Sequence, residues 1–336
     1  MNKKLFFIPA MAGLVLASCS NDEQGIVVSE KQSMKVTVAL NAPGTRAMIT
    51  DSYFGSGESI GLTVVDDGGT TYDGQDYSNI KFSSNGTVVD GTGQIWTSGT
   101  DVMLSATEGE VFGYYPWVDG ADVAAIAMDV NSQTDYMYSS EKKGLSNSNP
   151  DCSLTMNHAL AAIRVTLKNS ATSPYTGEGA ITGITLNSKG LGSKGTLNAK
   201  TRVTSVDEST LNSDLVALAS GTDKLSAATA DGYSYVYMVV PSSETADLTA
   251  ESNNIDVTVV MDGNTFSNTV DLDTKSLKVE KGKIYTITLT AMSTGFEMGS
   301  DTNGDGVIDE NDEPAVKVNT WEESTEVFEQ DMNIKQ

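Results

Sequence analysis

The stretch at positions 301–312, DTNGDGVIDEND, places oxygen-bearing side chains two residues apart. This spacing lets successive carboxylates and an amide converge on one hard cation, while a glycine at the sixth position permits a sharp turn. The stretch matches a calcium-binding loop at every ligand position. The predicted ligands are Asp301, Asn303, Asp305, the Val307 carbonyl, Asp309 and Asp312.

The elements around this loop predict a structural role for Ca²⁺ rather than a sensing role. A calcium switch of the helix-loop-helix kind needs flanking helices, whereas Pro314 and the alternating run AVKVNTW (315–321) follow this loop. The cation would neutralise the carboxylates and fix the exit of a C-terminal strand. An extracellular site of this kind has a Kd on the order of 10⁻⁴ to 10⁻³ M. The alternative is a solvated acidic hairpin without metal.

Other residues offer little chemistry, and we expect no enzyme. The sequence has a single histidine, His158, which lies in an apolar run and is predicted to be buried and hydrogen-bonded. No set of Ser, His and Asp or of Cys and His for nucleophilic catalysis is evident. Asp66 and Asp67 are adjacent carboxylates in a glycine-rich turn, where solvation is the expected state.

The first nineteen residues predict export as a bacterial lipoprotein. Lys3 and Lys4 precede an apolar run from 5 to 16, and LASC ends at Cys19, the position at which lipoprotein signals are cut and acylated. Lipidation of Cys19 leaves Cys152 as the one free thiol, a small buried hydrophobe. Acidic residues soon after Cys19 resemble the signal that sends some lipoproteins to the outer face of the outer membrane.

The charge of the chain restricts its partners. The formal net charge is −24, and loss of Lys3 and Lys4 with the signal peptide makes it −26. Such acidity argues against nucleic acid and anionic lipid as partners. It favours a well-solvated surface protein that meets divalent cations.

The remainder of the sequence predicts an all-β protein. Short alternating or β-branched runs are separated by Ser, Thr, Gly, Asn and Asp. In MKVTVALN (34–41), Met34, Val36, Val38 and Leu40 share one face. Further strands are predicted at 60–65, 111–117, 161–168, 180–187, 233–240, 255–262 and 284–290, with turns at 66–69 and 262–264.

The order of several motifs resembles the fimbrillin family, the subunits of type V pili of Bacteroidales. The resemblance spans nearly the whole chain. The motifs that carry it, after the lipoprotein cysteine and the strand before GTRAM, are VFGYYPW (111–117), DYMYSS (135–140), LTMNHALAAIRVTL (154–167), YVYMVVPSS (235–243) and KGKIYTITLT (281–290).

This resemblance implies two tandem transthyretin-like β-sandwich domains behind a lipoprotein signal peptide. It also implies export to the outer membrane, cutting by an arginine-directed protease between Arg46 and Ala47, and polymerisation into a fimbrium with other pilin subunits. The expected divisions are a signal peptide at 1–18, a propeptide with a removable first strand at 19–46, domains at 47–170 and 171–295, and the acidic loop with C-terminal strands at 296–336.

Removal of the first strand would supply a reason to polymerise. Four apolar side chains leave with MKVTVALN, worth roughly 6 to 12 kcal/mol in total, while whole domains are stable by only about 5 to 15 kcal/mol. Another chain's strand could fill the vacancy. The resemblance points to the C-terminus as donor. The candidates there are Val316, Val318, Val327, Phe328, Met332 and Ile334.

Two alternatives stay open from the sequence. The C-terminal runs also suit ordinary edge strands of the second domain. The whole protein also suits a surface lipoprotein that does not polymerise, a tip adhesin or a pilus anchor, with a host or bacterial surface glycan or protein as its partner.

Overall fold

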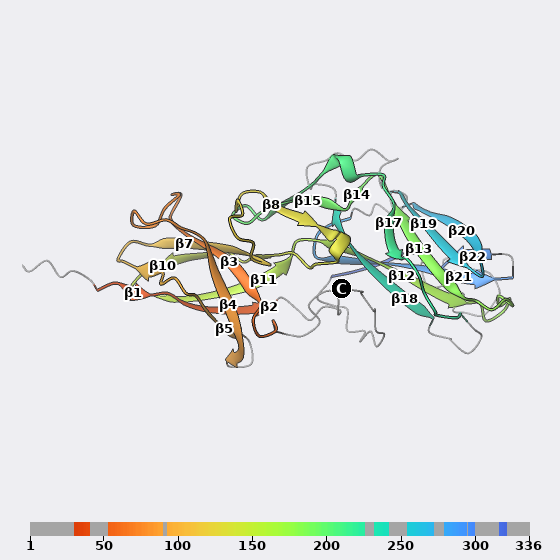
Figure 1. Cartoon of the computed structure of the whole chain (residues 1–336), viewed down its shortest axis with the longest axis horizontal. Helices are drawn as coiled ribbons and strands as arrows, with labels where there is room; N and C mark the ends of the chain where they lie inside the picture. The colour runs from red at the N-terminus through yellow and green to blue at the C-terminus, as the bar shows by residue number, and fades with distance from the viewer. Residues whose placement is uncertain are drawn as a thin grey trace, which may run out of the picture.

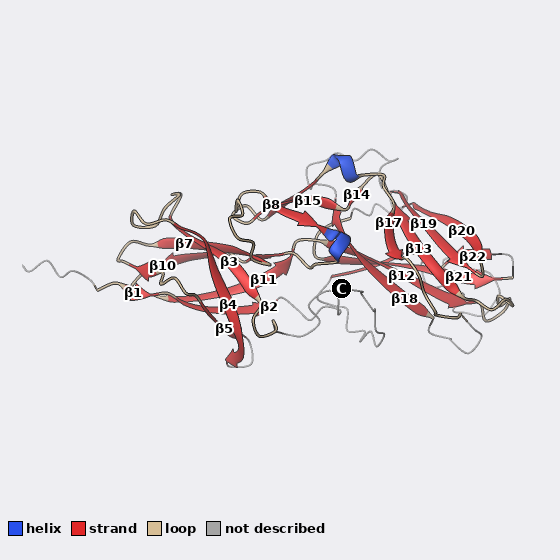
Figure 2. Ribbon diagram, viewed as in Figure 1, coloured by secondary structure: helices blue, strands red, loops and turns tan. Residues whose placement is uncertain are grey.

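The computed structural model describes residues 30–40, 53–89, 93–225, 232–241, 254–271, 279–293, 295–299 and 316–320. These residues form an elongated molecule built almost entirely of strands (Figures 1 and 2). The two helical segments of this part of the chain, η1 (Val130–Ser132) and η2 (Glu208–Thr210), are single 3₁₀ turns. Among the described residues no helix has the length and apolar character needed to cross a membrane.

The described residues of the first half form eleven strands. Their bounds are β1 (Gln32–Ser33), β2 (Lys35–Leu40), β3 (Ser59–Asp66), β4 (Tyr77–Val89), β5 (Gly93–Thr97), β6 (Met103–Leu104), β7 (Gly109–Tyr115), β8 (Ile126–Asp129), β9 (Met137–Ser139), β10 (Lys142–Leu145) and β11 (Asp151–His158).

Eight of these strands pair into one sheet that closes on itself. The order is β10-β7-β3-β4-β5-β2-β11-β9, and β7 also pairs with β9 through Tyr114↔Tyr138 and Tyr115↔Met137. The ring β7-β3-β4-β5-β2-β11-β9 is therefore a barrel, which we call the first barrel. Alternating residues fill its interior, including Ile60, Leu62 and Leu104, each fully buried.

In the second half, the part of the chain that the structure describes forms twelve strands. Their bounds are β12 (Ala161–Asn169), β13 (Ile181–Asn187), β14 (Leu191–Gly192), β15 (Lys194–Asn198), β16 (Val203–Val206), β17 (Leu215–Leu218), β18 (Tyr233–Pro241), β19 (Asn254–Met261), β20 (Asn264–Asp271), β21 (Lys283–Met292), β22 (Gly295–Met298) and β23 (Val316–Thr320).

Two sheets of the second half enclose its core. One has the order β14-β18-β12-β21-β22, with β23 also paired to β21, and the other has the order β17-β13-β19-β20. Ile163 and Val165 of the first sheet and Ile184 and Val257 of the second are fully buried in one cluster. β12 lies between β18 and β21, so both of its edges are paired, and its residues from Ala161 to Leu167 are buried on both faces.

A small sheet joins the two halves. β8 from the first half pairs with β15 from the second, and β16 completes the order β16-β15-β8 (Figure 1). Its core residues, such as Ile126 and Leu197, belong to the same hydrophobic cluster as the second half. The chain passes from the first barrel to the second set of sheets between β11 and β12.

The predicted strands are confirmed. Each of the eight runs named from the sequence contains a strand, and the turns at 66–69 and 262–264 connect β3 to β4 and β19 to β20. The all-β class is therefore established. The assignment of the two halves to transthyretin-like sandwiches remains a prediction.

The joint between the halves should depend on Leu197, which is fully buried and pairs with Ile126 across β15 and β8. We predict that Leu197→Ala lowers the free energy of unfolding by about 2 to 5 kcal/mol, because it leaves a cavity that neighbouring groups cannot fill. Val203→Ala on the adjacent strand, where the side chain is 38% exposed, is the control and should change it by under about 0.5 kcal/mol. Urea unfolding measures both, and equal effects would contradict this account of the joint.

Candidate functional site

β2 completes the first barrel and is the center of the candidate site. It lies between β5 and β11, pairing antiparallel with β5 from Val36↔Trp96 to Val38↔Gln94. On its other side it pairs parallel with β11 from Lys35↔Asp151 to Leu40↔Met156. The prediction that 34–41 forms a strand within the first sheet is thus confirmed.

The inward face of β2 is apolar, as its alternation predicts. Met34 is 7% exposed, Val36 3% and Val38 1%, and all three pack into the barrel core. Leu40 is only partly buried at the end of the strand. Three of the four predicted side chains are therefore fully buried. Their burial contributes about 5 to 9 kcal/mol to the stability of the barrel.

The outward face and the start of the strand make polar contacts. Lys35 Nζ lies 3.9 Å from an Asp151 carboxylate oxygen, with both side chains about three-quarters exposed, and Thr37 Oγ1 lies 3.0 Å from Ser153 Oγ. Lys31 Nζ pairs with Asp73 at 3.1 Å. Exposed ion pairs contribute roughly 0 to 1 kcal/mol each, so burial rather than charge holds β2 in place.

Phe54, Gln94 and Trp96 form the floor of the barrel beside β2, and their side chains are held by contacts in which β2 takes no part. The buried amide of Gln94 donates from Nε2 to the Phe54 carbonyl and accepts at Oε1 from the Phe54 amide, both at 2.7 Å. The Phe54 ring meets the Trp96 ring edge-on, with 5.1 Å between centroids, and lies 5.0 Å from that of Tyr115. Gln94 therefore holds the chain in place where it returns from the segment after β2.

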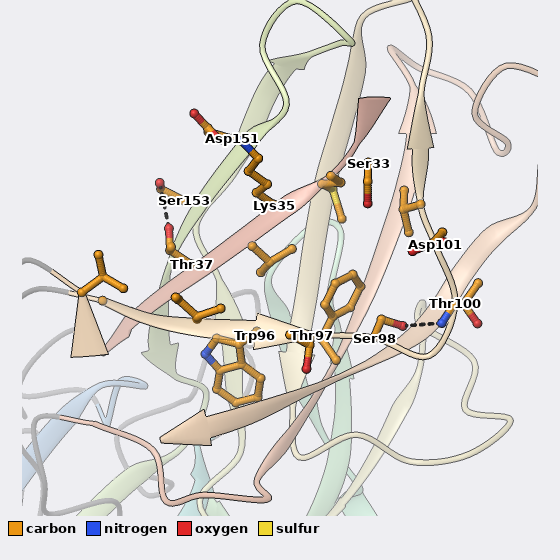
Figure 3. Close-up of a pocket in the computed structure, with 17 residues that line it drawn as sticks. Ser33, Lys35, Thr37, Trp96, Thr97, Ser98, Thr100, Asp101, Asp151 and Ser153 are labelled. Atoms are coloured by element: carbon orange, nitrogen blue, oxygen red, sulfur yellow. Dashed lines mark hydrogen bonds and ion pairs between the residues drawn. The ribbon is translucent and has the colours of Figure 1, made fainter. Parts of the chain in front are cut away.

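A cavity of about 670 Å³ opens along the seam between β2 and β5. Val36 from β2, Met34 just before it, and Trp96 from β5 are among its lining residues, and Lys35, Thr37 and Thr97 line it as well (Figure 3). Trp96 is 2% exposed, and its indole Nε1 has no hydrogen-bond partner among the described residues. A buried donor without a hydrogen bond is costly, and β2 supplies no acceptor for the Trp96 indole N–H.

Cys152 and His158, both on β11, are buried as expected. Cys152 is paired with Val36 and packs in the barrel core, where burial raises the pKa of its thiol to about 12. His158 Nδ1 lies 3.1 Å from Asp135 Oδ1 and 3.0 Å from Oδ2, and both side chains are at most 3% exposed. The predicted hydrogen-bonded, buried histidine is therefore confirmed.

The other predicted site residues lie mostly outside the described part of the chain. This holds for Cys19, for Arg46 and Ala47, and for the calcium ligands Asp301, Asn303, Asp305, Val307, Asp309 and Asp312. Within the described ranges no group of three or more metal-ligating side chains occurs.

The donor candidates divide into two sets. Val316 and Val318 belong to β23, whose backbone pairs antiparallel with β21 from Lys283↔Thr320 to Ile287↔Val316. Residues 316–320 thus lie against the second half of their own chain. Val327, Phe328, Met332 and Ile334 lie outside the described residues.

Sequence reasoning missed Gln94, Phe54 and Trp96. The run GQIWT (93–97) does carry a signal, because alternation places Gln94 on the same face as Trp96. A glutamine on an apolar face predicts a specific buried hydrogen bond, although its partner 40 positions away could not be named.

Comparison with known proteins identifies relatives along most of the chain. A family model described as fimbrillin-like matches residues 45–309. A protein of Bacteroides uniformis named "Putative fimbrium subunit Fim1C" is 24% identical over 311 residues, which cover 89% of this chain and 94% of that protein.

Solved structures share the fold. A "putative cell adhesion protein" of Bacteroides uniformis aligns with a TM-score of 0.61 and 19% identity, covering 87% of this chain and 99% of that one. A protein of Bacteroides ovatus with the same description aligns with a TM-score of 0.55 and 17% identity, covering 79% of this chain and 95% of that one. At these identities the likeness establishes the fold alone.

Cys152 offers a direct measure of whether β2 occupies its place. In a Cys19→Ser chain, in which Cys152 is the sole thiol, we predict almost no reaction with a maleimide at pH 8, because burial raises the thiol pKa to about 12. Proteolytic removal of residues up to Arg46 should free β2 and return the thiol toward its ordinary pKa of about 8.5, so labelling accelerates. Mass spectrometry follows the label, with urea-unfolded chain as the fully reactive control. Equal labelling rates in intact and unfolded chain would contradict the burial of this thiol under β2.

Proposed function

Because this chain belongs to the fimbrillin-like family, we propose that it is a structural subunit of cell-surface fimbriae that contributes to adhesion. In this proposal it reaches the outer membrane as a lipoprotein acylated at Cys19. A protease then cuts after Arg46, and the subunit polymerises by exchange of its first strand. Its partners are other pilin subunits, and its membrane contact before processing is the lipid on Cys19.

The observation that carries this proposal is the place of β2 in the first barrel. β2 pairs with a neighbour on both sides, and its Val36 and Val38 are buried in the core together with Met34, which directly precedes it, yet it is the first long strand of the described residues. Its loss would leave unpaired backbone on β5 and β11 and uncover Cys152 and Trp96. Such a vacancy favours strand addition from another chain.

The position of the proposed cut suits this mechanism. Arg46 lies between Leu40, the last residue of β2, and Phe54, which is clamped by Gln94. Cutting there separates β2 from the rest of the barrel, while the Gln94 clamp holds the other side of the cut in place. The opened groove would then retain its floor.

Processing provides the first test. We predict that Arg46→Ala and Arg46→Lys both block processing by an arginine-directed protease and abolish SDS-resistant ladders, because β2 then stays covalently attached. N-terminal sequencing of the surface-expressed protein should give Ala47 for the wild type and the acylated Cys19 for both variants. Arg202→Lys, on an arginine of the second half, is the matched control and should process normally. Ladders from an unprocessed Arg46→Ala chain would refute exchange of β2, and an uncut wild-type protein with affinity for glycan would favour an adhesin or an anchor.

We also propose that the loop 301–312 binds one structural Ca²⁺ through Asp301, Asn303, Asp305, Val307, Asp309 and Asp312. The ligand spacing supports this site. The loop precedes β23, so a bound cation would fix the path of the chain into that strand.

Calorimetric titration of the full chain tests the calcium site. We predict one site of low affinity that Asp301→Ala and Asp305→Ala each weaken at least tenfold, because each removes a charged oxygen ligand. Asp67→Ala, in the turn after β3, is the control and should leave binding unchanged. Unchanged binding in both loop variants would refute the assigned ligands.

A further inference from the structure

The arginines of this chain differ in what keeps a protease away from them. The sequence has three, Arg46, Arg164 and Arg202. An arginine-directed protease that cuts after Arg46 must spare the other two if the subunit is to stay whole. Arg164 lies in the middle of β12, which is paired on both sides, and is 3% exposed. Arg202 has a side chain that is 30% exposed and lies in a turn, the kind of place where chains are readily nicked.

Arg202 closes the turn between β15 and β16. Its amide donates to the Asn198 carbonyl at 2.7 Å, and the Thr201 amide donates to Asn198 Oδ1 at 2.9 Å. Its φ of 62° is in the left-handed region, which a residue with a side chain adopts where its surroundings hold it there. Val203, the next residue, pairs with Asn198 as the first residue of β16. The turn must therefore open locally before a protease can bind the chain on both sides of the Arg202–Val203 bond.

Lys281, which precedes β21, contacts the atom that a protease would have to engage. Its Nζ donates to the Arg202 carbonyl oxygen at 2.5 Å, and we call this contact the Lys281 lock. Hydrolysis would break the Arg202–Val203 amide and add one water, leaving a carboxylate on Arg202 and an amino group on Val203. During such a reaction the carbonyl oxygen of the scissile bond enters the oxyanion hole of the enzyme. The Lys281 ammonium must leave that oxygen first.

The lock also contacts the first barrel. The Nζ of the lysine lies 5.1 Å from the centre of the Tyr138 ring on β9, within the range of a cation–π interaction. Arg202 Nη2 lies 3.8 Å from Glu141 Oε2, just after β9. Lys200, in the same turn as Arg202, lies 4.0 Å from a carboxylate oxygen of Glu110, whose side chain is 7% exposed. Protection of Arg202 thus depends on contact between the two halves.

We propose that Arg202 is a second site for an arginine-directed protease, and that the Lys281 lock keeps it closed for as long as the two halves are packed together. The inference rests on the proposed processing after Arg46 and adds the device that confines the protease to that position. A subunit whose halves have not packed lacks Tyr138 against Lys281, and its Arg202–Val203 bond is open to hydrolysis. The protease that processes a folded subunit would then cut an incorrectly folded one in two.

Initial rates of cutting by a purified arginine-specific endoprotease test the lock. The substrate is the full chain carrying Cys19→Ser and Arg46→Lys. Its two remaining arginines are Arg164 and Arg202, and mass spectrometry identifies the fragments that each cut produces. Lys281→Met keeps much of the apolar stem and removes the ammonium. It should accelerate the cut after Arg202 about tenfold, because a charge-assisted hydrogen bond no longer opposes local opening and cutting follows the open population.

Arg164 is the internal control, because cutting there requires β12 to unfold. Its initial rate should stay unchanged in Lys281→Met, whereas a general loss of stability would accelerate both cuts. Tyr138→Leu should accelerate the cut after Arg202 about threefold, since the lysine loses the ring that it lies against. Lys189→Met, on an exposed lysine of the second half, should change it less than twofold. Equal acceleration at both arginines, or none after Arg202, would overturn the lock.

The chain with its native Arg46 separates the lock from the proposed function. The same protease should cut this chain after Arg46 and leave the Arg202–Val203 bond whole. Equally fast cutting at the two positions would overturn the lock. Resistance at Arg46, together with faster cutting after Arg202 in Lys281→Met, would overturn the proposed processing and support the lock.

Discussion

The first barrel depends on the parallel ladder between β2 and β11. Every other pairing in that sheet is antiparallel. β2 and β11 are brought together from positions more than a hundred residues apart, from Lys35↔Asp151 to Leu40↔Met156. Parallel neighbours always require a long connection. Closure of this sheet therefore depends on a segment at the beginning of the chain that no adjacent hairpin holds in place.

This constraint explains the placement of the polar groups near the seam. The Gln94 clamp on Phe54 and the edge-on contact of Phe54 with Trp96 keep the floor ordered without help from β2. The contacts that β2 makes itself are mainly backbone ladders and apolar burial, which any alternating strand can reproduce. The groove is consequently specific for a pattern of side chains and much less so for a particular sequence.

Much of the fold could be predicted from local sequence, because strand formation here follows alternation and turn residues. MKVTVALN, the DDGG turn and the buried His158 are cases in which neighbouring residues carry the information. The predicted division at 170/171 stays a prediction, while the chain passes from the barrel to the second half between β11 and β12. β12 is buried on both faces up to Leu167, but Arg164 and Thr166 alternate with its apolar residues, so its sequence is typical of a half-buried strand and does not identify the sheet to which it belongs.

The contacts of the site that could not be predicted from the sequence also depend on how distant strands pair. Nothing near Val36 in the sequence indicates that β11 is its parallel partner or that Trp96 lies opposite, because both contacts are long-range. Gln94 could be recognised as a polar residue on an apolar face, but Phe54 could not be recognised as its partner. Alternation predicts which side chains enter a core, whereas the hydrogen bonds of that core depend on the topology.

In the proposed function, cutting the chain after Arg46 would break no contact among the described residues of the barrel, yet it would change the equilibrium of β2. While attached, the strand refills its groove as an intramolecular event, at an effective concentration of the order of millimolar or higher. Once cut, it is lost by dilution, and its three buried side chains no longer compete at that concentration. A donor tail making similar contacts remains attached to its own subunit. If the subunit polymerises as proposed, strand exchange can therefore proceed even when the replacing strand fits no better than β2.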